Sequence, residues 1–298
     1  MTVEKLGFIG LGNMGMPMTK NLIDAGYEVY GMDVNEESLK TFEAQGGKVA
    51  QTTEELVTQT TFIMTSLPTP KIVEAIYCGE QGLIETAREG TLLIDFSTVN
   101  PSLNDELADK CNAKGLKYLG APVSGGVIGA VQATLTIMVG GDEKAYERAK
   151  PVFDVLGQNI FLLGDRSSVG TRIKLLNNLM IGFYTKGVAE MIVLAESVGL
   201  SPDKVYEILN VSYGQSKIYT RNYAEYMKND DFNPGFSIDL LLKDMRLAQE
   251  MAMEGKVDLT FTNQLIENYD KISKEGYGHL DISATYLATA KNAKEEGQ

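Results

Sequence analysis

The sequence has a single histidine, His279, among its 298 residues. Mechanisms that need two histidines are therefore excluded, and both histidine-supported zinc sites and Ser-His-Asp hydrolysis lose most of their support. Cysteine is almost as scarce. Cys78 and Cys111 form neither a CxxC metal-binding motif nor a disulfide framework, which favours a reducing, cytoplasmic environment. We expect no metal site, and proton transfer would fall to lysine, tyrosine, aspartate or glutamate.

The chain also lacks an excess of positive charge. Lysine and arginine number 27 against 40 aspartates and glutamates, which gives a net charge of −13 and argues against a nucleic-acid partner. Long apolar runs are absent as well, so we expect no membrane span. The N-terminus begins MTVEKLGFIGLGNMG, without a basic leader before an apolar segment, and this predicts neither a secretory signal nor a transit peptide.

The pattern of apolar and polar residues changes near residue 165. Before it, short β-branched or aliphatic runs alternate with amphipathic stretches, and after it the pattern is helical throughout. The expected strands are 5–9, 28–32, 61–66, 92–95, 117–120, 134–139 and 160–163. We therefore predict an α/β fold, with a Rossmann-type doubly wound sheet in residues 1–165 and an all-α domain in residues 166–298. The long helix 171–198 joins the two domains; it is apolar on nearly every side, so it must be buried between domains or against another subunit.

A glycine-rich turn follows the first expected strand. Residues 10–15 read Gly-Leu-Gly-Asn-Met-Gly and stand between strand 5–9 and a helix, which is the setting of the dinucleotide-binding fingerprint. Gly10 allows the tight turn, Gly12 lets the backbone approach a pyrophosphate, and Gly15 permits close packing of the helix on the strand. The free amides at the start of the helix then favour the phosphates.

Asp33 ends the second expected strand, 21 residues after Gly12. A carboxylate at this place accepts hydrogen bonds from the ribose hydroxyls of NAD. It would repel a 2′-phosphate, and the next residues, Val34-Asn35-Glu36, offer no arginine or lysine to offset that repulsion. The cofactor is therefore predicted to be NAD rather than NADP. The alternative interpretation is an ordinary glycine turn with a surface aspartate.

Five motifs, in order and in register, resemble the β-hydroxyacid dehydrogenase family. They are the turn at 10–15, Asp-Phe-Ser-Thr at 95–98, Ala-Pro-Val-Ser-Gly-Gly at 121–126, Gly-Thr-Arg-Ile-Lys-Leu-Leu-Asn-Asn at 170–178 and Lys-Asp-Met-Arg-Leu-Ala at 243–248. The resemblance covers essentially the whole chain. One departure is Gly120, where members more often carry an aspartate. The related 6-phosphogluconate dehydrogenases fit less well, since they are much longer and carry histidine in place of Asn177.

The resemblance implies a role for particular residues. The catalytic residues would be Lys174 and Asn178, and the substrate would lie near Ser124, Gly125, Gly126, Asn177, Phe236 and Asp244. The cofactor would contact Gly10, Leu11, Gly12, Asn13, Met14, Gly15, Asp33, Leu67, Pro68, Ser97, Thr98 and Lys243. Two of these assignments have plain alternatives. Ser97 and Thr98 would also suit a helix cap, and Lys243 with Asp244 would also suit a solvated pair on a helix.

The chemistry of Lys174 also follows from its surroundings. Lys174 and Asn178 are one turn apart on the expected long helix and share a face. Burying an ammonium in so apolar a helix is costly, which favours a group that gives up and regains a proton in each turnover. Lys174 would donate a proton in reduction and remove one in oxidation, while Asn178 holds the lysine or the reacting oxygen. The alternative is a snorkelling lysine whose ammonium stays in water.

The segment Ser124-Gly125-Gly126 follows an expected strand and precedes a short helical pattern. Bare glycine amides and a serine hydroxyl at a helix start form a receptor for a carboxylate, unless the segment is a plain glycine turn. Lys174 and Lys243 would add local positive charge in an otherwise acidic protein. The substrate is therefore predicted to be a small carboxylic acid that carries a hydroxyl or carbonyl group.

Two other functions remain open on the sequence alone, and a third is disfavoured. A non-catalytic dinucleotide-binding protein on the same fold need not retain Lys174, and an imine or ketone reductase typically uses another proton donor. The Tyr-x-x-x-Lys pattern of short-chain dehydrogenases occurs at Tyr146–Lys150 and Tyr213–Lys217, but chance produces such pairs in a chain with 14 tyrosines. We prefer a homodimeric or homotetrameric NAD-dependent dehydrogenase that interconverts a 3-hydroxy acid and its semialdehyde.

Overall fold

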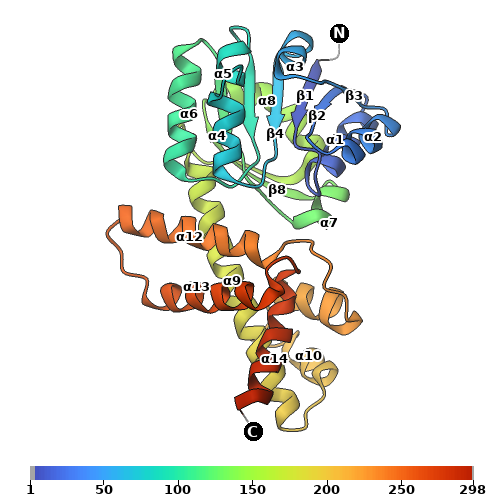
Figure 1. The fold of residues 1–298 in the computed structure, drawn as a ribbon, viewed down its shortest axis with the longest axis vertical. Coiled ribbons are helices and arrows are strands. Elements are labelled where there is room, and N and C mark those ends of the chain that lie inside the picture. The colour runs from blue at the N-terminus through green and yellow to red at the C-terminus, as the bar shows by residue number, and fades with distance from the viewer. Residues whose placement is uncertain (1–3, 297–298) are drawn as a thin grey trace. The chain divides into compact units, whose positions relative to one another are not determined.

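The computed structural model describes residues 4–296 and divides into two compact units, which meet in the sequence between Lys174 and Leu175. The first unit contains the strands and the second is helical (Figure 1). The predicted fold class, a Rossmann-type sheet followed by an all-α part, is confirmed.

The sheet of the first unit has the strand order β3-β2-β1-β4-β5-β6-β8-β7, and β9 lies beside β8. Its strands are β1 (Lys5–Ile9), β2 (Glu28–Met32), β3 (Lys48–Val49), β4 (Phe62–Thr65), β5 (Leu92–Asp95), β6 (Lys117–Gly120), β7 (Val123–Ser124), β8 (Leu135–Gly141) and β9 (Gly157–Leu162). From β3 to β6 all pairs are parallel, whereas β8 runs antiparallel to both β6 and β7. Reversal of the strand order beside β1 creates the switch point at which doubly wound folds bind their ligands.

Alternate residues of the central strands face two separate cores. Phe62 and Met64 of β4 belong to one hydrophobic cluster, and Ile63 between them belongs to the other. The first cluster is covered by helices α1 (Gly15–Asp24), α2 (Glu36–Ala44), α7 (Gly126–Val131) and α8 (Glu143–Leu156). The second is covered by α3 (Thr53–Gln59), α4 (Pro70–Cys78), α5 (Leu83–Thr86) and α6 (Pro101–Ala113). Burial on both faces explains why these strands read as continuous apolar runs.

The second unit is built on the long helix α9 (Val169–Ser197), whose first turns belong to the first unit. The helices that follow are α10 (Pro202–Leu209), α11 (Lys217–Thr220), the π-helix η1 (Arg221–Tyr226), the 3₁₀ turn η2 (Met227–Asn229), α12 (Ile238–Glu254), α13 (Thr260–Ile272), the π-helix η3 (Ser273–Tyr277), the 3₁₀ turn η4 (Ile282–Ala284) and α14 (Thr285–Glu296). Tyr269 and Met245 lie at the centre of the α12–α13 core.

Helix α9 is buried along one side and exposed along the other. Leu175, Ala189 and Ile192 are buried, but an apolar stripe on the opposite side is open to solvent. The exposed members of this stripe, spaced three, four or more residues apart, are Ile173, Leu176, Met180, Tyr184 and Leu194. The apolar sequence of 171–198 therefore does not mean burial on every side within one chain.

Candidate functional site

The carboxyl ends of five neighbouring strands stand level in the first unit. Ile9 pairs with both Met32 and Thr65, Thr65 pairs with Asp95, and Asp95 pairs with Gly120. The segments that leave these strands therefore start in one row along the same edge of the sheet. They carry the glycine turn, Asp33, Leu67, Ser97 and the approach to Ser124, so the fold gathers the predicted cofactor residues of this unit at one edge.

The three glycines of the turn are needed for different steric reasons. Gly10 has a φ of +97°, and a Cβ there would lie 2.2 Å from the carbonyl oxygen of Ser66. At Gly15 a Cβ would lie 1.8 Å from the carbonyl oxygen of Gly10, because α1 begins directly against the strand. Gly12 is different, since a Cβ placed there would meet no other atom within 4 Å. The open space at Gly12 is the cradle that a pyrophosphate would fill, so the turn fits a dinucleotide.

The carboxylate of Asp33 is fastened to the turn. Its Oδ2 accepts a hydrogen bond from the backbone amide of Leu11 at 2.6 Å, and its Oδ1 accepts one from the amide of Asn35 at 2.8 Å. Each oxygen keeps a further lone pair, so the group can still accept from a ribose diol. Asp33 therefore ties the end of β2 to the phosphate-binding turn, and it is not a free surface aspartate.

Ser97 links the loops that follow β4 and β5. Its Oγ accepts a hydrogen bond from the amide of Leu67 at 2.9 Å, while its own amide donates to Asp95 Oδ1 at 3.0 Å. The side chain is 4 % exposed. The helix-cap alternative for Ser97 is wrong, because Asn100 occupies the cap of α6 and the hydroxyl of Ser97 is turned to Leu67.

Asp95 organises the residues beneath this loop. Thr65 donates its hydroxyl to Asp95 Oδ1 at 2.7 Å and lies 3.0 Å from the hydroxyl of Tyr77. Burial, with the nearby Asp95 carboxylate as a second cause, holds the pKa of Tyr77 well above its usual range. The phenol of Tyr77 stays neutral, and the network fixes the floor of the cofactor edge without carrying chemistry itself.

Ser124, Gly125 and Gly126 lie where β7 passes into α7. Gly125 and Gly126 have φ values of +130° and +62°, which favour glycine, and both are exposed. Helix α7 has six residues, so its dipole is short, and the accessible glycine amides and the serine hydroxyl are its main polar groups. The carboxylate receptor at this segment stays a prediction.

The start of α9 is packed against the sheet backbone to backbone. A Cβ on Gly170 would lie 1.9 Å from the carbonyl oxygen of Met138, and one on Gly120 would lie 2.3 Å from that of Ser167. The missing side chain at Gly120 thus has a structural reason here. A buried hydrogen bond of 2.6 Å from Thr171 Oγ1 to Asn104 Oδ1 adds a fixed polar contact. Together these contacts set the position of Lys174 one turn further along the helix.

Lys174 is the last residue of the first unit and is half-buried. Its neighbours along α9 alternate between buried Leu175 and exposed Leu176, which leaves the lysine on the border between the two sides of the helix.

Asn178 is fully buried in the second unit and is turned toward α12. Its Nδ2 donates to Asp244 Oδ2 at 2.6 Å, and its Oδ1 accepts from Asn177 Nδ2 at 3.0 Å. Asp244 Oδ1 in turn pairs with Lys243 Nζ at 3.0 Å. The solvated-pair alternative for Lys243 and Asp244 is wrong, because their side chains are 22 % and 4 % exposed. Four of the predicted site residues therefore form one network.

Phe236 lies in the loop before α12, half-buried against the core of the second unit. The single histidine, His279, is an exposed turn residue. One contact that supports the site carried no sequence signal. Asn104 and Thr171 are 67 positions apart, and neither belongs to a motif that predicts their contact.

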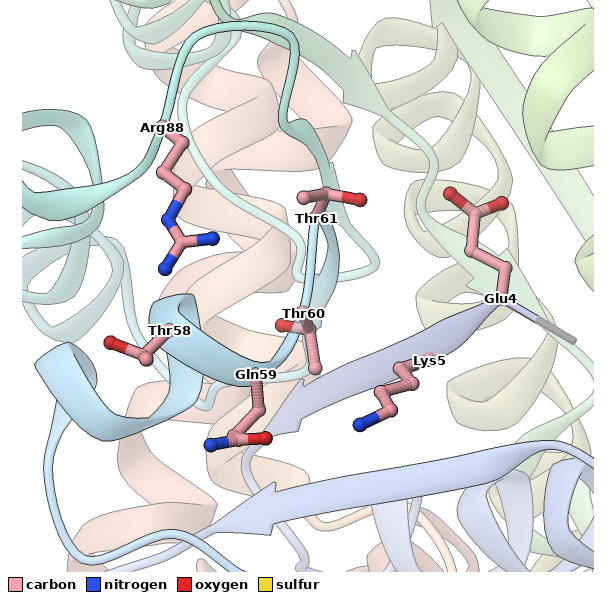
Figure 2. Close-up of a pocket in the computed structure, with 7 residues that line it drawn as sticks. All are labelled: Glu4, Lys5, Thr58, Gln59, Thr60, Thr61 and Arg88. Atoms are coloured by element: carbon pink, nitrogen blue, oxygen red, sulfur yellow. The ribbon is translucent and has the colours of Figure 1, made fainter. Parts of the chain in front are cut away.

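A pocket of about 410 Å³ lies at the opposite, amino-terminal edge of the sheet (Figure 2). It is lined by Glu4, Lys5, Thr58, Gln59, Thr60, Thr61 and Arg88. Several of these groups are engaged by neighbours: Lys5 pairs with Glu28 at 3.3 Å, and the hydroxyls of Thr58 and Thr60 donate to helix carbonyls. None of the predicted site residues lines this pocket, and it is not the candidate site.

Two further properties bear on the site. Within residues 4–296, no group of histidine, cysteine, aspartate and glutamate side chains could hold a metal ion. The helices that the structure describes are too short or too polar to cross a membrane.

Two family models together match most of the chain. Residues 5–164 match the NAD binding domain of 6-phosphogluconate dehydrogenase, and residues 168–288 match the NAD-binding domain of NADP-dependent 3-hydroxyisobutyrate dehydrogenase. The chain is 38 % identical to 2-(hydroxymethyl)glutarate dehydrogenase of Eubacterium barkeri, over 94 % of this chain and 93 % of that protein. It is 35 % identical to 2-hydroxy-3-oxopropionate reductase of Escherichia coli, over 95 % and 96 %.

A solved structure agrees with these relatives. The 3-hydroxyisobutyrate dehydrogenase of Mycobacterium tuberculosis, determined with L-serine, superposes with a TM-score of 0.86 at 32 % identity. The match covers 96 % of this chain and 99 % of that one.

Proposed function

Because this chain belongs to the β-hydroxyacid dehydrogenase family, we propose that it interconverts a small 3-hydroxy acid and its semialdehyde, with Lys174 as the acid and base. It is an NAD(P)-binding oxidoreductase by membership of that family. The observation that carries the finer proposal is the placement of Lys174 by the glycine-lined start of α9, on the unit that bears the dinucleotide turn.

The residues divide the work of the reaction. The turn at Gly10–Gly15 and Asp33 would hold a dinucleotide, which would supply hydride for the carbonyl carbon of the substrate. The Lys174 ammonium gives its proton to the carbonyl oxygen, so that an alcohol forms, and in the oxidative direction the neutral amine removes the hydroxyl proton. Asn178, held by Asp244 and Asn177, keeps its amide in one orientation one helical turn from the lysine. Ser97, Thr98, Leu67, Pro68 and Lys243 are proposed to orient the nicotinamide half.

The substrate is proposed to be a carboxylate. The glycine amides and the hydroxyl of Ser124–Gly126 supply donors, and Phe236 and Asp244 are proposed to line the pocket. The relatives named above act on 2-(hydroxymethyl)glutarate and 2-hydroxy-3-oxopropionate. Both names describe acids in which an alcohol or aldehyde carbon lies next to the carbon that bears a carboxylate, and that pattern defines the substrate class proposed here.

NAD is proposed as the preferred cofactor. The Asp33 carboxylate, fixed by Leu11 and Asn35, would stand beside the 2′-position of the adenosine ribose. Val34 beyond it is fully exposed and uncharged, so nothing in this segment offsets the repulsion of a 2′-phosphate. The working protein is proposed to be a cytoplasmic homodimer or homotetramer whose copies cover the apolar stripe of α9.

The proposal is tested by NADH oxidation over a panel of semialdehydes, ketoacids and cyclic imines. We expect turnover with a semialdehyde acid and higher kcat/KM with NADH than with NADPH. Lys174→Met should lower kcat by about 100-fold or more while the Kd of NADH changes little. A Lys174→Met enzyme that keeps a tenth of the turnover overturns the role of the lysine, and turnover confined to imines overturns the substrate class.

A further inference from the structure

A buried ion pair lies in the second unit and shares no residue with the network around Asn178. Arg221 and Asp281 form two parallel hydrogen bonds, Nη1 to Oδ1 at 2.9 Å and Nη2 to Oδ2 at 2.7 Å. Asp281 is fully buried, and the Arg221 side chain is 21 % exposed. The guanidinium also lies over the ring of Tyr226, 4.3 Å from its centroid. The pairing with Asp281 raises the pKa of Arg221 although burial opposes it, so the arginine remains charged.

The carboxylate of Asp281 is saturated with donors, three on each oxygen. Oδ1 also accepts from the amide and hydroxyl of Ser283, at 3.0 and 2.9 Å. Oδ2 also accepts from the amides of Gly235 and Phe236, at 3.1 and 3.0 Å. Two of these donors are backbone amides of the loop that contains Gly235 and Phe236, which has no regular secondary structure.

The same loop is held by backbone bonds on either side. The amide of Asp281 donates to Phe232 at 3.0 Å, and the amide of Ile282 donates to Phe236 at 2.9 Å. Gly235 completes the arrangement, because a Cβ there would lie 2.4 Å from the hydroxyl oxygen of Tyr226. The backbone on both sides of Phe236 is thus fixed by groups that come from the end of the chain and from η1.

We propose that the Arg221–Asp281 pair is a positioning device that sets where Phe236 stands and thereby tunes which hydroxy acid the enzyme accepts. This inference rests on the proposed function, in which Phe236 lines the substrate pocket. A buried ion pair is weak evidence for stability, because apolar residues often replace one at no loss, and its best-supported use is to impose one specific arrangement. Pocket side chains need such support, since a difference of one methylene changes discrimination about 10–200-fold.

The test is a double-mutant cycle between Asp281→Asn and Phe236→Ala. Asparagine has the same shape, but whichever way its amide is turned, an NH₂ group faces three donors. Kinetics in the oxidative direction, with NAD and a panel of 3-hydroxy acids that differ by one methylene, give the readout. We expect each single variant to raise the KM for the preferred acid about tenfold and to flatten the preference within the panel. The double variant should be no worse than the poorer single one, with kcat and the KM for NAD within about threefold of wild type.

Two further variants separate positioning from mere stability. Asp270→Asn breaks the more exposed Arg246–Asp270 pair in the same unit and should leave the KM for the acid unchanged. Arg221→Lys keeps the positive charge but loses the two parallel hydrogen bonds to Asp281, so it should show the same altered substrate preference. It serves as the second variant in case Asp281→Asn does not fold. Effects of Asp281→Asn and Phe236→Ala that multiply in the double variant would overturn the inference, as would a fall in Tm without a change in KM. If Phe236→Ala changes nothing, or the wild-type enzyme oxidises no hydroxy acid, the proposed function fails first and the inference with it.

Discussion

Asp244 determines which way the buried amide of Asn178 is turned. Its Oδ2 accepts from Asn178 Nδ2 at 2.6 Å, and Lys243 neutralises the other oxygen. In Asp244→Asn the new NH₂ group must face either Asn178 Nδ2 or Lys243 Nζ, so one of these two contacts is lost, at a cost of about 1–3 kcal/mol. We expect kcat to fall about tenfold or more while the Kd of NADH is unchanged, as measured by steady-state kinetics and equilibrium binding. Glu254→Gln, exposed at the far end of α12, is the control, and equal effects of the two changes would count against the role of Asp244.

Cys111 couples the stability of the first unit to alkaline pH. Burial raises the pKa of this thiol from 9.0 to about 12. The thiol ionises at a lower pH in the unfolded chain than in the folded protein. Its contribution to the free energy of unfolding is therefore fully present below pH 9 and is lost as pH rises toward 12. Between neutral pH and about pH 10.5, wild type should lose about 2 kcal/mol more than Cys111→Ala, measured by urea unfolding at both pH values. Equal losses would mean that the thiol is not protected.

The residues with a local signature were the ones that the sequence could predict. Asp33 was selected because its distance from the glycine turn is set by one strand–helix–strand unit, and Lys174 because its motif is continuous; their roles stay predictions. The hydrogen bond from Leu11 to Asp33 was not predictable, since its donor is a backbone amide whose side chain carries no information. The same holds for Asp281, whose partners come from three separate segments.

At the scale of the elements, substitutions at Gly12 and Gly15 should have different effects, one on dinucleotide binding and the other on stability. Gly15→Ala places a Cβ 1.8 Å from a backbone oxygen, so α1 must move away from β1 and the protein should lose about 2 kcal/mol or more. Gly12→Ala meets nothing within 4 Å and should leave Tm unchanged, but it fills the space of the pyrophosphate and should raise the Kd of NADH about tenfold. Thermal unfolding and NADH titration of both variants check this. A Gly12→Ala protein that binds NADH normally would contradict the assignment of the cradle.

Elements with a strong period were predicted closely, and short ones were not. The bounds of β1, β2, β5 and β6 agree with expectation because each strand is a compact apolar run between turn signals. The strands β3 and β7 have two residues each and exist through their neighbours, so no sequence pattern marks them. The strand β8 runs to Gly141, past the expected end, because its glycines allow the segment around Ser167 to cross it closely.

For the whole molecule, the apolar stripe of α9 predicts self-association. Exposed Leu176, Met180 and Leu194 on one side of a helix are unusual for a monomer, and a second copy is the proposed cover. Sedimentation at micromolar concentration should give two or four times the 32.6 kDa mass of one chain. Met180→Glu, at 45 % exposure, should shift that mass to the monomer, whereas Lys271→Glu on the exposed side of α13 should not. A wild-type monomer would refute the prediction.

The junction between the two units has a consequence for recombination among relatives. The units part inside α9, after Lys174, and the first turn of that helix rests on Gly120 of β6 and on the backbone of β8. A chimera joined in the loop before Val169 would therefore set a foreign first turn against Gly120 and β8. A chimera joined after Lys174 would take the lysine from one parent and Asn178 from the other. Such a chimera should be active only where the two parents place these two side chains alike on the shared helical turn.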